Sequence, residues 1–169
     1  QGLADAFFKM DIAFVSEDAK TVNKLIFETM YHAAVEMSNE LSIERLGPMR
    51  TIRQDLDNDY MTFKDYDDPC CVEMNNLRGK EIPKVMRELL SEYQPLYQET
   101  LNLREDHLGS YATFTDSPAS RGELQFDLWG VIPSDRYDWN ALRESVMTYG
   151  MRNSLLVAPM PTASTSQIL

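Results

Sequence analysis

The sequence predicts an α/β fold that is mostly helical, with one or a few parallel strands. The first observation is a continuous apolar run over residues 154–158, the pattern of a strand buried on both faces of a parallel sheet. The second is its setting, because a helix is expected over 139–149 and a hydroxyl-rich segment follows at 162–166. Helix, strand, loop and helix start in succession form one step of a parallel sheet or barrel. No second strand is evident to pair with 154–158, so other segments must complete the sheet.

A long amphipathic helix is expected near the start of the chain. Ser16 is a good N-cap, and Glu17 and Asp18 place negative charge in the first turn. Apolar residues then recur at three- and four-residue steps, which predicts a buried stripe with methionines filling the core. The stripe consists of Ala19, Val22, Ile26, Met30, Ala33, Met37 and Leu41. His32 lies beside it and is read as an ordinary hydrogen-bonded histidine. The pair Gly47-Pro48 is expected to break the pattern.

The segment 47–106 contains an acidic tract and a further helix. Residues 55–60 alternate acids as a calcium loop does, but Tyr60 stands where the turn glycine belongs and Tyr66 where the closing glutamate belongs. A solvated acidic loop is therefore predicted. Residues 82–93 read as a helix with one apolar face, which must be covered either by the same subunit or by a partner.

Residues 109–131 are rich in Gly, Ser, Thr, Asp and Pro, which predicts a loop. Its aromatic residues are expected to pin it to the body of the protein; they are Tyr111, Phe114, Phe126 and Trp129. Asp138 is the expected N-cap of the helix over 139–149, and Gly150 the expected left-handed C-terminal cap. The buried stripe of this helix is predicted to be Trp139, Leu142, Val146 and Tyr149.

Pro159 and Pro161 cannot continue a strand ladder, so the chain must turn after residue 158. Thr162 to Thr165 would then present backbone N–H groups and hydroxyls at the start of a helix, an arrangement that suits a phosphate group. A second interpretation is purely structural, because Ser164-x-x-Gln167 fits a capping box. The two are compatible if Ser164 caps the helix while Thr165 and the loop amides meet a ligand.

Three separate segments resemble the large subunit of class I ribonucleotide reductase in its eukaryotic form, a ribonucleoside-diphosphate reductase, and they occur in the same order. They are residues 1–7 (QGLADAF), residues 117–122 with 125–129 (SPASRG and QFDLW), and residues 152–169 (RNSLLVAPMPTASTSQIL). The resemblance implies that the chain is a fragment of a ten-stranded α/β barrel, from the C-terminal part of the catalytic barrel. It also implies that the loop holding the diphosphate of the ribonucleotide substrate consists of Pro161, Thr162, Ala163, Ser164 and Thr165.

The resemblance also shows what this chain lacks for the family's chemistry. The family reduces ribonucleotides to deoxyribonucleotides through a thiyl radical on a finger-loop cysteine, assisted by a neighbouring Asn and Glu. No Asn-x-Cys-x-Glu occurs here, and Cys70 and Cys71 lie outside the matching segments. Adjacent cysteines are poorly placed to form a disulfide with each other, so two reduced thiols are expected. We therefore assign no catalytic, cofactor-binding or metal-binding residue to this chain. The resemblance implies a radical supplied by a metal-containing small subunit and a homodimer of the intact large subunit.

Three parts are predicted: a barrel-associated helix over 1–46, an insertion without counterpart in the family over 47–106, and a barrel segment with the phosphate loop over 107–169. The apolar fraction of 43% is that of a globular protein. The net charge of −11 argues against nucleic-acid binding, and we expect no membrane span and a cytoplasmic location.

One alternative is a non-catalytic interaction protein in which the insertion is the functional part. A third possibility is a simple nucleotide-binding module.

Overall fold

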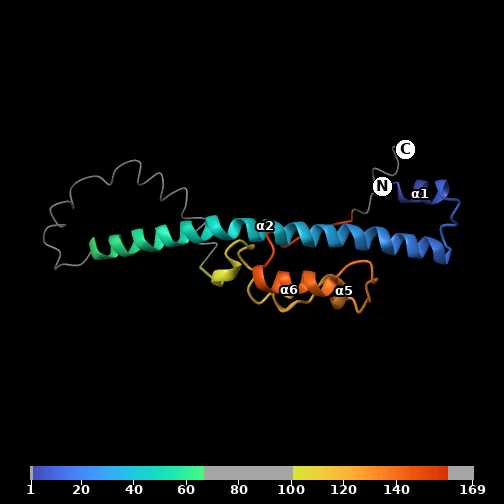
Figure 1. The fold of residues 1–169 in the computed structure, drawn as a ribbon. Coiled ribbons are helices and arrows are strands. Elements are labelled where there is room, and N and C mark those ends of the chain that lie inside the picture. Colours follow the sequence, from blue (N-terminus) through green and yellow to red (C-terminus); the bar gives the residue numbers. More distant parts are fainter. Residues whose placement is uncertain (1, 67–100, 160–169) are drawn as a thin grey trace.

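The computed structural model describes residues 2–66 and 101–159, with the backbone alone described over 55–66. Within these ranges the protein is helical and contains no β-strand. One long helix, α2, dominates the arrangement; α6 lies beside its middle part and α1 lies near its N-terminal end (Figure 1). The elements are α1 (Leu3–Lys9), α2 (Glu17–Tyr66), the short 3-10 helices η1 (Glu105–His107) and η2 (Ala119–Arg121), α5 (Gln125–Leu128) and α6 (Trp139–Tyr149).

The predicted start of α2 is confirmed. The Ser16 Oγ accepts a hydrogen bond from the backbone N–H of Ala19 at 3.1 Å, which satisfies one of the free donors of the first turn. Glu17 and Asp18 occupy that turn, where negative charge favours the helix dipole.

The predicted break at Gly47-Pro48 is wrong, because α2 continues through it to Tyr66. A proline inside a helix removes one hydrogen bond, but contacts on either side of Pro48 hold this helix together. Leu46 and Met49 are buried in the core, and Arg50 forms an ion pair with Asp106 at 3.0 Å. The tract 55–60 is consequently helical rather than an acidic loop. The helix predicted over 82–93, together with Cys70 and Cys71, lies outside the described residues.

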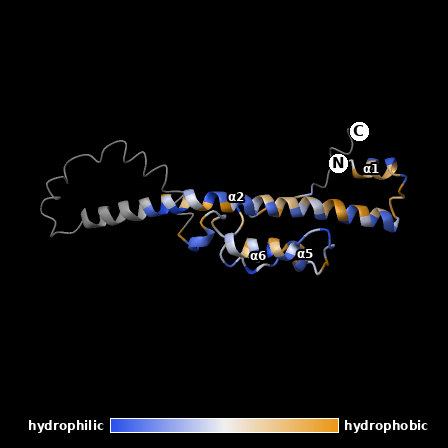
Figure 2. Ribbon diagram, in the orientation of Figure 1, coloured by the Kyte–Doolittle hydropathy of each residue, from blue (hydrophilic) through white to orange (hydrophobic). Residues whose placement is uncertain are grey.

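The face of α2 that is buried differs from the predicted apolar stripe. Ala19 is buried, but Ile26, Ala33 and both methionines expected in the core, Met30 and Met37, are exposed. The covered face consists of Val35, Ser38, Asn39, Ser42, Leu46 and Met49. This is the face that contacts α6 and η1. Apolar residues are frequent along the N-terminal half of α2 (Figure 2), so periodicity alone did not identify the covered side.

Helix α6 has the predicted bounds and cap. The Asp138 Oδ1 accepts from the backbone N–H of Ala141 at 2.9 Å, and Trp139, Leu142 and Val146 are buried. Tyr149 is 39% exposed, contrary to prediction, and the contact that α2 makes at this residue is with its carbonyl oxygen. Gly150 has the predicted positive φ of 76°, but its ψ of −164° places it outside the left-handed helical region.

Two of the loop aromatics are pinned as predicted and one is not. Phe114 and Phe126 are buried with Leu108 and Leu124 in the core, whereas Trp129 is 72% exposed. Tyr111 packs against this core while remaining partly exposed.

The run 154–158 does not form the predicted buried strand in the described part of the chain. Leu155 is 89% exposed, and no described segment offers a strand for it to pair with. A strand forms only when a neighbour accepts and donates its ladder hydrogen bonds, so an apolar run alone does not produce one.

Candidate functional site

The predicted phosphate loop, Pro161 to Thr165, lies outside the described residues. The structure describes the chain that leads to it, from the last residue of α6, Tyr149, to Pro159. We call residues 149–159 the approach. The structure also describes the surface along which this chain runs. The contacts of Pro161 to Thr165 themselves stay a prediction.

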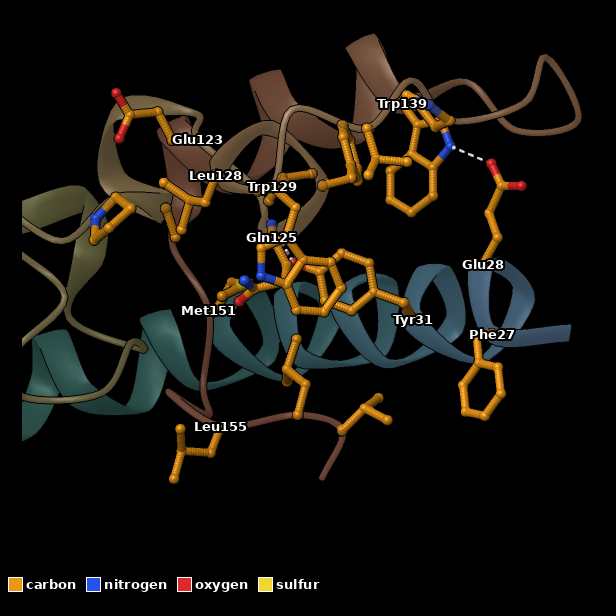
Figure 3. A pocket seen from close by; sticks show the side chains of 18 of the residues that line it. Phe27, Glu28, Tyr31, Glu123, Gln125, Leu128, Trp129, Trp139, Met151 and Leu155 are labelled. Carbon is orange, nitrogen blue, oxygen red and sulfur yellow. Dashed lines mark hydrogen bonds between the residues drawn. The ribbon is translucent and has the colours of Figure 1, made fainter. Parts of the chain in front are cut away.

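The approach forms one wall of a cavity of about 520 Å³ between α2, the α5 region and residues 154–159 (Figure 3). Lys24, Phe27, Glu28 and Tyr31 of α2 line one side of it. The apolar approach residues that line it are Leu155, Leu156, Val157 and Pro159. The run predicted to be a buried strand thus borders a cavity.

Aromatic side chains line part of the cavity. The rings of Tyr31 and Trp139 are stacked with centroids 6.0 Å apart, and Phe126 meets Trp139 edge-on at 4.8 Å. Burial raises the pKa of Tyr31, with the Asp127 charge adding to this and the hydrogen bond from Gln125 opposing it. The neutral Tyr31 hydroxyl accepts from the backbone N–H of Gln125 at 3.0 Å, which ties α2 to α5.

Glu28 is one of three charged residues that line the cavity, with Lys24 and Glu123. Its Oε1 accepts from the Ser134 N–H at 2.7 Å. It also accepts from the Trp139 indole N–H at 3.3 Å (Figure 3). Burial acts to raise the pKa of Glu28, but the hydrogen bonds from Ser134 and Trp139 and the Lys24 charge outweigh it and lower the pKa below its ordinary value. Lys24 Nζ donates to the Ile132 carbonyl at 2.9 Å, so both side chains hold the loop over 131–138 against α2.

Among the described residues, His32 has aromatic and carboxylate neighbours in place of the predicted hydrogen bond. Its ring stacks on Tyr137 at 4.1 Å, and its Nδ1 lies 3.8 Å from a Glu36 carboxylate oxygen. Over residues 2–54 and 101–159, whose side chains the structure describes, no group of three His, Cys, Asp or Glu side chains is placed to hold a metal ion.

The polar residues of α2 that contact the approach were not predicted from the sequence. Ser38, Asn39 and Ser42 are almost fully buried and bond the chain over 149–153. We name these three residues the polar seam of α2. Their spacing on one helical face was a usable signal, because small polar residues there favour close approach of another backbone.

The chain belongs to the ribonucleotide reductase family. The family model described as "Ribonucleotide reductase, barrel domain" matches residues 1–169, a range that spans segment 47–106. The resemblance drawn from the three sequence segments is therefore confirmed, and an α/β barrel fragment is the fold that this family implies.

Similar proteins carry the corresponding name. A ribonucleoside-diphosphate reductase large subunit of Caenorhabditis elegans is 37% identical over the whole chain, and one of Arabidopsis thaliana is 38% identical. A ribonucleoside-diphosphate reductase large chain 2 of Saccharomyces cerevisiae is 36% identical. Each match covers 100% of this chain but only 14%, 13% and 12% of the respective relative. No helix among the described residues is long and apolar enough to cross a membrane.

Proposed function

We propose that this chain is a barrel segment of the large subunit of a ribonucleoside-diphosphate reductase. The observation that carries the proposal is the family match over residues 1–169. The large subunits named above, each similar along the whole chain, add support. The intact protein reduces ribonucleotides to deoxyribonucleotides through a thiyl radical on a cysteine located outside this segment.

Within that enzyme, residues Pro161 to Thr165 bind the diphosphate of the substrate. Hydroxyls and free backbone N–H groups at the start of a helix match the charge and the acceptor oxygens of a diphosphate. Their contribution is to bind and orient the substrate so that its ribose faces the radical cysteine, without proton transfer by the loop itself. A capping bond from Ser164 is compatible with this role.

The partners follow from the same proposal. A metal-containing small subunit supplies the radical, and the large subunit acts as a homodimer in the cytoplasm. Segment 47–106 begins within α2, which continues to Tyr66, so its first part is continuous with the barrel-associated helix. No nucleic acid or membrane takes part in the reaction.

The test is kinetic and uses the intact reductase. We expect the double variant Ser164→Ala, Thr165→Ala to raise the KM for a ribonucleoside diphosphate by about tenfold or more, because charge-assisted hydrogen bonds each contribute about 1.5–3 kcal/mol. The matched control is Ser166→Ala, which removes a neighbouring hydroxyl outside the proposed loop. A double variant with the same KM and kcat as the parent would contradict the proposed role.

A further inference from the structure

Part of the connection between α5 and α6 lies along one side of α2. We call residues 132–137 the strap. Lys24 Nζ donates to the Ile132 carbonyl at 2.9 Å. One helical turn further along α2, Glu28 Oε1 accepts from the Ser134 N–H at 2.7 Å. The strap meets these two side chains in the same order as they occur in the helix, so it runs in the direction of α2.

The end of the strap is attached through Tyr137. The Tyr137 hydroxyl donates to Thr29 Oγ1 at 2.8 Å. Its ring stacks on His32 with centroids 4.1 Å apart. These attachments come from α2 side chains, and among the described residues no backbone–backbone hydrogen bond joins the strap to that helix. The closed position of the strap therefore depends on a small set of side-chain contacts.

The strap has no buried residue, whereas the helix that follows it is well packed. Ile132 is 83% exposed, but Trp139 and Val146 of α6 are 6% and 0% exposed. A segment with few buried contacts and a few partly exposed hydrogen bonds opens at a lower free energy than a packed helix does. We therefore expect the strap to open while α2 and α6 stay folded.

Glu28 joins the strap to the cavity described above. The oxygen that accepts from the Ser134 N–H also accepts from the Trp139 indole N–H at 3.3 Å. Figure 3 shows the bond to Trp139. Glu28, Trp139 and Pro133 of the strap all line the cavity. Loss of the carboxylate would therefore release a strap amide and a ring of the cavity wall together.

We propose that the strap opens and closes over this end of the cavity, and that the Glu28 carboxylate holds it closed. Opening separates Ser134 from Glu28 and gives solvent access to the Trp139 ring. The helices stay packed during this motion. The inference goes beyond the proposed reductase function and does not depend on the role of Pro161 to Thr165.

The first test is hydrogen exchange of the full protein, followed by mass spectrometry, in water and in urea below the unfolding transition. In the parent, the Ser134 amide should exchange at least about tenfold faster than the amides over 142–149 of α6. Urea should accelerate α6 exchange but leave Ser134 exchange nearly unchanged, because local opening exposes little surface. Equal rates and equal urea dependence at both places would overturn the proposal, because the strap would then open only with the whole protein.

The second test is Glu28→Ala, which removes two hydrogen bonds to a charged group. Exchange at Ser134 should become about tenfold faster or more. Glu40→Ala is the matched control, since Glu40 is an exposed carboxylate of α2 for which no contact with the strap is seen; Ser134 exchange should stay within about twofold of the parent. A Ser134 rate in Glu28→Ala equal to that of the control would overturn the role of Glu28. Should Glu28→Ala fail to fold, Glu28→Gln keeps the shape without the charge and should accelerate exchange about threefold.

The third test asks whether the strap covers the cavity. Hydroxyl-radical footprinting compares Trp139 with Trp129, which is 72% exposed and outside the strap. In Glu28→Ala, Trp139 should be modified faster than in the parent, with Trp129 modified at the same rate. If Ser134 exchanges faster in this variant while Trp139 modification is unchanged, the strap does not control access to the cavity and that part of the proposal fails.

Discussion

The two faces of α2 are built from different residues and meet different surroundings. One face carries Ile26, Met30 and Met37 at helical spacing and is exposed in the described structure. The other carries the polar seam together with Val35, Leu46 and Met49, and it is covered by residues 103–153. The more regularly apolar side of the helix is therefore not the side on which the described protein packs.

Close approach between backbones accounts for which face of α2 is covered. A Cβ at Gly109 would collide with the Ser42 carbonyl, and one at Gly150 would collide with the Ser110 hydroxyl. At such short range, backbone carbonyls and N–H groups become buried and must find hydrogen-bond partners. Short polar side chains supply those partners without adding bulk, whereas the long side chains of Met30 or Met37 would hold the two backbones apart.

The largest expected effect is a difference in stability between the same substitution made on each of the two faces. Met49→Ala should destabilise the 169-residue chain by about 2–5 kcal/mol, because Met49 is 4% exposed and its removal leaves a cavity. Met37→Ala should cost no more than about 0.5 kcal/mol, because Met37 is 52% exposed. Chemical denaturation of both variants measures the difference. Equal losses would show that the exposed stripe is covered in solution.

A smaller loss is expected when the polar seam loses its amide. The Asn39 side chain donates to the Gly150 carbonyl at 2.8 Å and accepts from the Ser145 hydroxyl at 2.6 Å. Asn39→Ala leaves both groups without their partner and should cost about 1–3 kcal/mol. Asn140→Ala, at an exposed position of α6, is the control and should change stability by about 0.5 kcal/mol or less. An Asn39 variant as stable as its control would contradict the proposed contribution of the polar seam to stability.

A third and smaller loss of stability is expected when α6 loses its N-cap. Asp138→Ala removes the acceptor for the Ala141 N–H and should cost about 1 kcal/mol, while Asp138→Ser should retain most of the stability. Thermal unfolding of the two variants distinguishes capping from a general effect of removing charge. If serine proves as damaging as alanine, the hydrogen bond is not what stabilises the helix start.

The smallest effect is pH-dependent and concerns the loop held by Glu28. The folded-state pKa of Glu28 lies below its ordinary value, so the carboxylate adds stability above the unfolded-state pKa and loses it as the pH falls through the folded-state pKa. Acidification from about pH 6 to pH 3 should therefore lower the Tm of the parent chain more than that of Glu28→Gln. Parallel Tm losses in the two proteins would contradict this contribution.

Several features were determined by local sequence, because their causes lie within a few residues. Ser16 and Asp138 were identified as helix caps, and each accepts the predicted kind of hydrogen bond from a backbone N–H three residues later. The family was recognised from short segments and confirmed along the whole chain. The positive φ of Gly150 was likewise predictable from its place after an amphipathic helix.

Tertiary structure decided what depends on distant partners. The helix passes through Pro48 because Leu46 and Met49 are buried on either side of it, and residues 154–158 form no strand where no described neighbour pairs with them. The polar seam is covered because the backbone over 149–153 lies against it. Apolar periodicity describes one helix at a time, whereas burial and hydrogen-bond pairing depend on which second surface arrives, and this is why the covered face of α2 emerged only from the fold.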